Sequence, residues 1–146
     1  MINQEQFKIT SLIVKLGNSV TNYRNIKMEN IDLTSAQSDA LIATLREPGI
    51  TASQVKKNLQ LSQSTVAGII SRLEHKGLIA KTIDHKDGRK SILQPTQRGL
   101  DIENDLKKIA LDTQNTLVQG MSEEEQQEFK RLLEIALQNL QTTRQE

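Results

Sequence analysis

Short polar side chains gather at Ser62-Gln63-Ser64-Thr65, and small residues and an arginine follow at Ala67, Gly68 and Arg72. Such side chains suit the reading of DNA bases, because glutamine pairs with adenine and a hydroxyl donates to or accepts from several bases. Small residues let a backbone approach a duplex closely, and an arginine can reach a phosphate. The candidate DNA-binding residues of this segment are therefore Gln63, Ser64, Thr65, Gly68 and Arg72.

A second candidate set lies at residues 84–90, where an Asp-Gly dipeptide is a turn signal between two strand-like runs. An arginine on a thin hairpin can enter a minor groove, most favourably where that groove is narrow. Asp84 and Asp87 are the candidates for positioning this hairpin. Either of them could set its angle by pairing with Arg72 or Arg89. The candidate DNA-binding residues here are Lys86, Arg89 and Lys90.

The net charge of +1 for the whole chain hides an uneven distribution. Residues 51–98 hold nine Lys and Arg against three Asp and Glu, a net charge of about +6. Residues 99–146 hold ten Asp and Glu against five Lys and Arg, a net charge of about −5. A basic middle between a neutral and an acidic flank indicates one polyanion-binding face, and double-stranded DNA is the expected partner.

Several classes of function lack their residues in this sequence. Cysteine is absent, which excludes a disulfide framework, a thiolate metal site and a thiol redox switch. The two histidines, His75 and His85, fall short of the three or four clustered ligands that a zinc site needs. No nucleophile motif or phosphate-binding loop indicates an enzyme. We therefore expect no metal, no cofactor and no catalytic residues.

The chain also lacks the marks of export or membrane insertion. Apolar runs are short, three residues at Leu12-Ile13-Val14 and four at Ala40-Leu41-Ile42-Ala43, whereas a membrane helix needs about 20. The N-terminus has no basic start followed by an apolar run, so no secretory signal is visible. We expect a soluble protein of the cytoplasm with no membrane partner.

The first candidate set is expected at the start of a helix. Ser62 is placed as its N-cap, the helix is predicted over residues 63–76, and Gly77 supplies the left-handed residue that ends it. The apolar residues that should face the core are Val66, Ile69, Ile70 and Leu73. A shorter helix, opened by a capping box, is predicted over about residues 51–59. The two helices form a helix-turn-helix.

The second candidate set is expected at the tip of a hairpin. Residues 78–83 and 89–93 predict its two strands. Pro95 lacks a backbone donor and therefore belongs at the end or the edge of a strand. A helix-turn-helix followed by a basic hairpin is a winged helix-turn-helix.

Long amphipathic helices are predicted on both sides of this lobe, over residues 4–28, over residues 97–118 and from Ser122 onward. Their apolar stripes are too continuous to stay exposed on lone helices, which predicts a homodimer held by both chain ends. The candidate dimerisation residues are Phe7, Leu12, Leu16, Phe129, Leu133, Ala136 and Leu140.

These elements predict a mainly α fold with a small β-hairpin wing (α+β), arranged as a winged helix-turn-helix with N- and C-terminal dimerisation helices. Residues 1–31 are expected to form the N-terminal dimerisation helix. Residues 32–98 are expected to form the DNA-binding lobe, and residues 99–146 the C-terminal dimerisation helices.

The sequence resembles the MarR (multiple antibiotic resistance regulator) family. The resemblance is strongest at the wing signature, which comprises Asp84, Asp87, Gly88 and Arg89. It extends to the segments Leu61-Ser62-Gln63-Ser64-Thr65-Val66, Ser71-Arg72-Leu73-Glu74-His75-Lys76-Gly77-Leu78-Ile79 and Thr96-Gln97-Arg98-Gly99. Pro95 departs from the family, which more often has an aliphatic residue at that position.

The resemblance implies an obligate dimer that represses genes by blocking promoters at pseudo-palindromic operators. It places Ser64, Thr65 and Arg72 on the reading helix and Arg89 at the wing tip. It also implies release by a small effector, often an aromatic anion, in a cleft between the dimer base and the reading lobe. Val20 and Tyr23 are the weaker candidates for such a pocket, because packing is the commoner role of residues on an apolar stripe.

Two other classes of function stay open at this stage. A winged helix can serve as a protein-interaction module without operator binding, because the fold alone does not fix the function. A small helical enzyme is the other alternative. The basic middle of the chain and the wing signature favour a DNA-binding transcription regulator.

Overall fold

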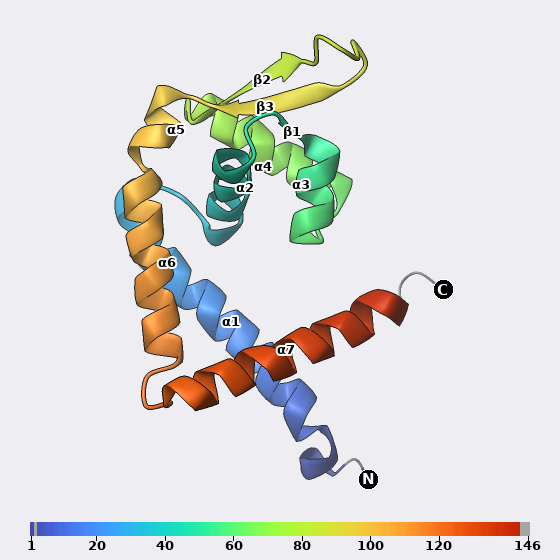
Figure 1. Ribbon diagram of the computed structural model, residues 1–146, viewed down its shortest axis with the longest axis vertical. Helices are drawn as coiled ribbons and strands as arrows, with labels where there is room; N and C mark the ends of the chain where they lie inside the picture. Colours follow the sequence, from blue (N-terminus) through green and yellow to red (C-terminus); the bar gives the residue numbers. More distant parts are fainter. Residues whose placement is uncertain (2, 144–146) are drawn as a thin grey trace. The chain divides into compact units, whose positions relative to one another are not determined.

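The computed structural model describes residue 1 and residues 3–143, and it confirms a mainly helical winged helix-turn-helix (Figure 1). The elements in chain order are a 3₁₀ turn Gln4–Phe7, α1 Lys8–Met28, a 3₁₀ turn Glu29–Ile31, α2 Ser35–Arg46, β1 Ile50–Thr51, α3 Ala52–Leu59, α4 Gln63–His75, β2 Ile79–Ile83, β3 Ser91–Pro95, α5 Gln97–Asp101, α6 Glu103–Leu117 and α7 Glu123–Thr143. In the described part of the chain, no helix is both long and apolar enough to cross a membrane.

The chain divides into two compact units, Met1–Thr113 and Gln114–Glu146. The first unit holds α1 to α5 and most of α6, and the second holds the end of α6 and α7. The helix-turn-helix, the wing and α1 therefore belong to one compact unit. The functional division at residues 31 and 98 stays a prediction.

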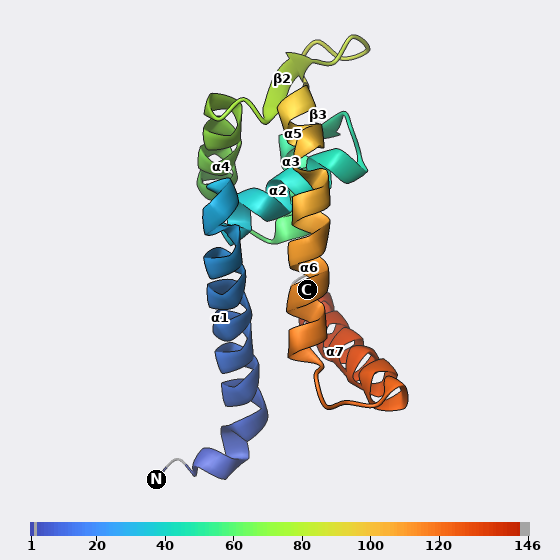
Figure 2. The same cartoon turned by 90° about the vertical axis from the view of Figure 1, so that its left-hand side faces the viewer.

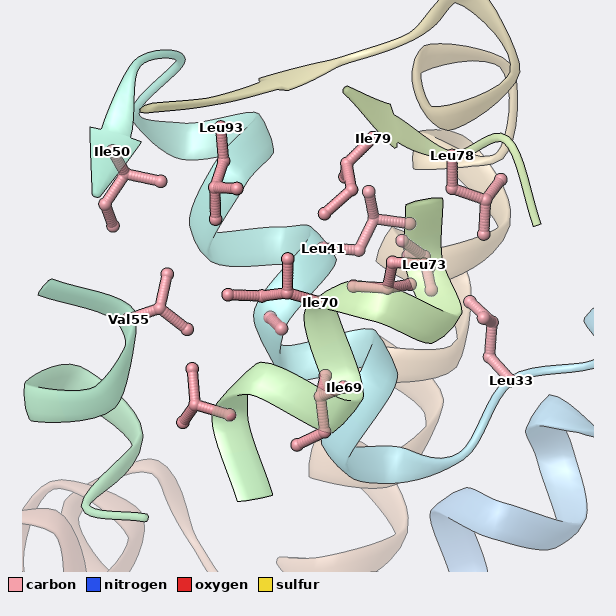
Figure 3. Close-up of a cluster of buried hydrophobic side chains, with 13 residues drawn as sticks. Leu33, Leu41, Ile50, Val55, Ile69, Ile70, Leu73, Leu78, Ile79 and Leu93 are labelled. Atoms are coloured by element: carbon pink, nitrogen blue, oxygen red, sulfur yellow. The ribbon is translucent and has the colours of Figure 1, made fainter. Parts of the chain in front are cut away.

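One side of α4 forms the centre of the hydrophobic core. Its residues Val66, Ile69, Ile70 and Leu73 are all buried, as the sequence predicted. Leu41 of α2 and Leu93 of β3 are also buried in this cluster. In Figure 3 the labelled side chains of α2, α3, α4 and the three strands point into the same cluster. Burying one such side chain contributes about 1.5–3 kcal/mol, so this contact fixes α4 within the lobe.

Both ends of α4 have the local contacts that the sequence indicated. At its start the Ser62 hydroxyl accepts a hydrogen bond from the Thr65 N–H at 3.2 Å. At its end Gly77 has φ +72°, and the Leu78 N–H donates to the Leu73 carbonyl at 3.0 Å. This is the Schellman pattern, in which a glycine adopts a left-handed conformation without the usual steric penalty. The limits of the reading helix are therefore set locally.

The wing belongs to a three-stranded antiparallel sheet with strand order β1-β3-β2. The sequence analysis missed β1, a two-residue strand that pairs Ile50 with Leu93. It also placed the return strand two residues too early, at 89–93 in place of Ser91–Pro95. The reason is the length of the turn, which the Asp84 N–H closes by donating to the Lys90 carbonyl at 2.8 Å. Pro95 is the last residue of β3, as predicted.

The single helix predicted over residues 97–118 is wrong, because the chain breaks at Ile102 into α5 and α6. The Thr96 hydroxyl donates to the Gly77 carbonyl at 2.6 Å, which ties the start of α5 to the end of α4. Leu106 of α6 is buried in the core of the lobe. The break at Ile102 allows both segments to make their contacts.

The second unit begins α7 with the predicted capping box. The Ser122 N–H donates to Glu125 at 2.9 Å, and the Glu125 N–H donates to the Ser122 hydroxyl at 3.1 Å. The bond from the Ser122 backbone holds the pKa of the Glu125 carboxyl below its ordinary value. The large apolar side chains that α7 exposes are Leu132, Leu133, Ile135, Leu137 and Leu140.

Gly99→Ala should destabilise the lobe. A Cβ at Gly99 would lie 2.3 Å from the Leu78 carbonyl oxygen, so either α5 or the backbone at Leu78 must shift. Overpacking of this kind costs about 1–3 kcal/mol. Urea unfolding should show a lower midpoint for Gly99→Ala than for Leu100→Ala, a truncation of the exposed neighbour. Equal midpoints for the two variants would contradict this packing.

Candidate nucleic-acid interface

The outward side of α4 carries most of the residues that the sequence assigned to DNA reading. Gln63, Ser64, Thr65, Gly68 and Arg72 are all exposed, opposite the buried side of the same helix. In the first turn the Ser62 hydroxyl lies 2.8 Å from the Thr65 hydroxyl and 3.3 Å from the Ser64 hydroxyl. The helix therefore begins with a cluster of exposed hydroxyl groups whose hydrogens can rotate to suit a partner.

No contact within the described chain requires a glycine at position 68. A Cβ built on Gly68 would meet no atom within 4 Å, and the residue lies in the interior of a regular helix. A glycine there makes the helix about 1 kcal/mol less stable than an alanine. Gly99 differs, because the Leu78 carbonyl leaves it no room for a side chain. The absence of a side chain at Gly68 is therefore useful only to something that approaches the helix from outside.

The wing tip projects beyond the helices of its unit (Figure 2). Lys86, Arg89 and Lys90 are exposed there. Together they form a small basic surface at the end of the hairpin. A thin basic hairpin of this kind has the shape and charge to enter a minor groove.

Asp84 and Asp87 hold the backbone of the wing tip. Asp84 accepts a hydrogen bond from the Lys86 N–H at 3.0 Å, and Asp87 accepts one from the Arg89 N–H at 3.1 Å. The expected ion pairs with Arg72 or Arg89 are absent from the described part of the chain. Each carboxylate bonds an N–H two residues onward, a local turn contact that needs no distant partner. The side chain of Arg89 is therefore left available to an external partner.

The C-terminal end of α4 is anchored by contacts that the sequence analysis did not find. The Lys76 ammonium donates to the Gln37 side chain at 3.0 Å and to the Asp32 carbonyl. Gln37 also accepts from the Thr34 N–H, as part of the capping box that opens α2. These partners lie about forty residues earlier in the chain, so no local pattern could reveal them. They join the end of the reading helix to the junction between α1 and α2.

Polar contacts hold α1 against the rest of its unit, including one with α2 and one with α6. Arg24 binds both carboxylate oxygens of Asp39 in α2, at 2.5 and 3.3 Å. The Tyr23 hydroxyl donates to Asp112 of α6 at 2.6 Å. Val20 and Tyr23, the candidates for a ligand pocket, are both half-buried on α1. The contact with Asp112 joins Tyr23 to α6.

The candidate dimerisation residues lie on α1, on the turn before it and on α7. Phe7 and Leu12 are about half exposed, and Leu16 and Phe129 are partly buried. Leu133, Ala136 and Leu140 are exposed, and Leu140 has 72% of its surface open. Five of these seven side chains are thus exposed in the single chain.

The described residues hold no cluster of metal ligands. They contain no group of three or more His, Cys, Asp or Glu that could hold a metal ion. The interface offers hydroxyls, amides, arginines and lysines on one compact unit.

Comparison with known proteins places this arrangement among regulators. A model of the MarR family matches residues 31–90, which span the helix-turn-helix and the wing up to Lys90. A relative in Bacillus subtilis (strain 168), the uncharacterized HTH-type transcriptional regulator YybA, is 24% identical over 126 residues. That alignment covers 86% of this chain and 84% of the relative.

Solved structures share the fold across nearly the whole chain. A MarR transcriptional regulator from Methanosarcina mazei Go1 is 27% identical with a TM-score of 0.85, over 92% of this chain and 97% of the other. The MepR–DNA complex from S. aureus is 26% identical with a TM-score of 0.83, over 89% and 96%. The PcaV regulator from Streptomyces coelicolor, in complex with its natural ligand, is 25% identical with a TM-score of 0.79, over 94% and 96%.

Gly68→Ala should stabilise the protein and weaken its binding to DNA. The added methyl raises helix stability by about 0.5–1 kcal/mol, because it has open space within the protein. The same methyl obstructs a partner that approaches the helix closely, at a cost of about 1–3 kcal/mol for a lost base contact. Thermal unfolding and duplex titration measure the two effects separately. Asn115→Ala on α6 is the control, which should stabilise the protein without weakening its binding to DNA. A Gly68→Ala variant that binds DNA as tightly as wild type would contradict the close approach of DNA to α4.

Proposed function

This chain belongs to the MarR family of winged helix-turn-helix transcription regulators, and we propose that it is a homodimeric repressor that binds a pseudo-palindromic operator in duplex DNA. MarR regulators are not enzymes, and we assign no reaction to this chain. A regulator of this kind acts where the chromosome is, so we also propose a cytoplasmic location.

The single observation that carries the proposal is the two-sided character of α4. One side is buried in the core of the lobe, and the other presents hydroxyls, a glycine without an internal role and Arg72. A helix fits the major groove, where each base pair shows a distinct pattern of donors and acceptors. We propose that the first turn of α4, with Gln63, Ser64 and Thr65, faces the base edges.

We propose that the wing binds the neighbouring minor groove through Lys86, Arg89 and Lys90. Arg89 follows the turn that Asp84 and Asp87 stabilise, and its side chain is exposed. An arginine in a minor groove senses the width and the potential of the groove more than base identity. The reading helix would thus supply specificity, and the wing would supply affinity.

A dimer follows from the apolar faces of α1 and α7. Ile9, Ile13, Leu137 and Leu140 are among the large side chains that these helices leave exposed. A two-fold dimer places its two reading helices about one helical turn of DNA apart, or roughly 10 base pairs. The operator should therefore be an imperfect palindrome, since each half of the dimer reads the same sequence.

Repression and release by a ligand complete the proposal. A dimer seated on a promoter excludes the transcription machinery from the same DNA. Release requires a ligand that binds better to a conformation unsuited to the operator. The ligand complex of the related PcaV regulator supports a small-molecule effector here, and we propose an aromatic or anionic one. Val20 and Tyr23 are the residues of α1 that we propose for such a pocket.

Arg89→Ala and Ser64→Leu should weaken DNA binding in different ways. Arg89→Ala should weaken binding to operator and unrelated duplex alike and reduce the slope of log affinity against log salt by about 1. Ser64→Leu should weaken mainly the binding to the operator, by about 1–3 kcal/mol, because a bulky side chain displaces a base contact. Titration of both duplexes at several salt concentrations separates these effects.

Circular dichroism is the folding control for both variants, which change exposed residues. Wild-type binding that does not change between low and physiological salt would overturn the DNA proposal. The protein would then fit the alternative of a protein-interaction module. If Arg89→Ala binds the operator as tightly as wild type, the proposed contact between the wing and DNA is wrong.

Leu140→Glu should convert the dimer to a folded monomer. Leu140 is 72% exposed in the single chain, so a charge there has little effect on the monomer but is costly inside an apolar interface. Sedimentation at micromolar concentration should show a dimer for wild type and for Leu100→Glu, a control at an exposed leucine of α5. A wild-type protein that sediments as a stable folded monomer would contradict the dimer.

A further inference from the structure

A groove runs along α4, between α3 and Lys81 of β2, on the lobe that carries the reading helix. It has a volume of about 520 Å³ and is lined by α3, by one edge of α4 and by Lys81 of β2. The edge of α4 that faces it includes Ala67, Ser71 and Glu74, which adjoins the side that carries Ser64, Gly68 and Arg72. The groove shares Gln63 with the residues assigned to the base edges, and its other lining residues belong to neither of the two assigned sets.

The position of Lys81 follows from the register of the sheet. Lys81 pairs with Leu93 across β2 and β3, and residues directly opposite each other project from the same face. Leu93 and Ile79 are buried on the face that covers the helices. Lys81 therefore projects on this same face, just beyond the core, where it forms one wall of the groove.

A duplex bound as proposed must present a phosphate strand to this groove. The major and minor grooves of DNA are divided by one phosphodiester strand. If α4 enters the major groove and the wing enters the adjacent minor groove, that strand passes between them. The part of the groove where Lys81 of β2 joins Ser71 and Glu74 of α4 lies on the side of α4 that this strand would follow.

The side chains of the groove have the chemistry of phosphate binding. Lys56 of α3 and Lys81 of β2 supply positive charge, and the hydroxyls of Ser53 and Ser71 can donate hydrogen bonds. Ala67 is small and leaves room for a backbone. Lys56 and Lys81 have no acidic partner in the described part of the chain.

We propose that this groove seats the phosphodiester strand between the two DNA grooves, with Lys56 and Lys81 as phosphate-binding residues and Glu74 as a repulsive one. This inference rests on the proposed DNA binding. The Glu74 carboxylate lines the groove, and no side-chain partner neutralises it within the described residues. The Glu74 carboxylate repels the phosphate strand of any duplex, so it weakens operator binding and nonspecific binding alike.

The first experiment titrates a selected operator duplex, taken from a random-sequence library with the wild-type protein, and an unrelated duplex of equal length. Lys81→Met should weaken binding to both duplexes and lower the salt slope by about 0.9. Its deficit relative to wild type should therefore shrink roughly threefold between about 50 and 200 mM salt. The control is Lys108→Met, which removes the same charge from an exposed position on α6.

Glu74→Gln should act in the opposite direction. It should tighten binding to both duplexes by roughly two- to fivefold, as expected for one exposed charge interaction. Its control, Glu29→Gln, makes the same change in net charge at an exposed residue between α1 and α2. Equal affinities for Glu74→Gln and Glu29→Gln would overturn the repulsive role.

A second measurement tests the contact without relying on a variant that must fold. Single uncharged methylphosphonate linkages are placed in turn along one half-site of the operator. At one linkage the loss of affinity seen with wild type should disappear with Lys81→Met, because the two changes remove the same interaction. Strictly additive losses at every linkage would overturn the phosphate contact. Failure of wild type to bind any duplex would instead overturn the proposed function.

Discussion

The burial of one side of α4 is the contact on which the rest of this lobe depends. Leu73 of α4, Leu41 of α2 and Leu93 of β3 are almost completely buried in one cluster. The same cluster therefore holds both the reading helix and the sheet that continues into the wing (Figure 3). A close-packed interior resists deformation, so α4 and the base of the wing keep a fixed spacing in the free protein. A binding surface that is rigid in advance loses less conformational entropy when it docks.

Polar contacts around this core orient elements more than they stabilise them. Lys76 ties the end of α4 to the start of α2, and Arg24 binds Asp39 between α1 and α2. Single hydrogen bonds and ion pairs near the surface contribute about 0–1.5 kcal/mol each, no more than the burial of one leucine. These contacts mainly orient α1, because each one joins α1 or the junction between α1 and α2 to the rest of the lobe.

The parts of the fold that sequence reasoning found are those set by near neighbours. The Ser62 cap and the Gly77 terminus join residues three to five positions apart, so the limits of α4 could be predicted. The strand β1 and the break at Ile102 escaped prediction because tertiary contacts produce them. The position of the groove could not be predicted either, since it exists only once β2 is placed beside α3 and α4. The partners of Asp84 and Asp87 could not be predicted, because turn bonds to the backbone use the same carboxylates as ion pairs.

The central claim is that one rigid lobe presents α4 and the wing to duplex DNA at the same time. Amide hydrogen exchange of the full chain, with and without a selected operator duplex, tests it most directly. The account predicts new protection in the first half of α4 and at residues 84–90, with α7 unchanged between free and bound dimer. Protection that appears on α7 while α4 and the wing tip exchange as in the free protein would contradict it.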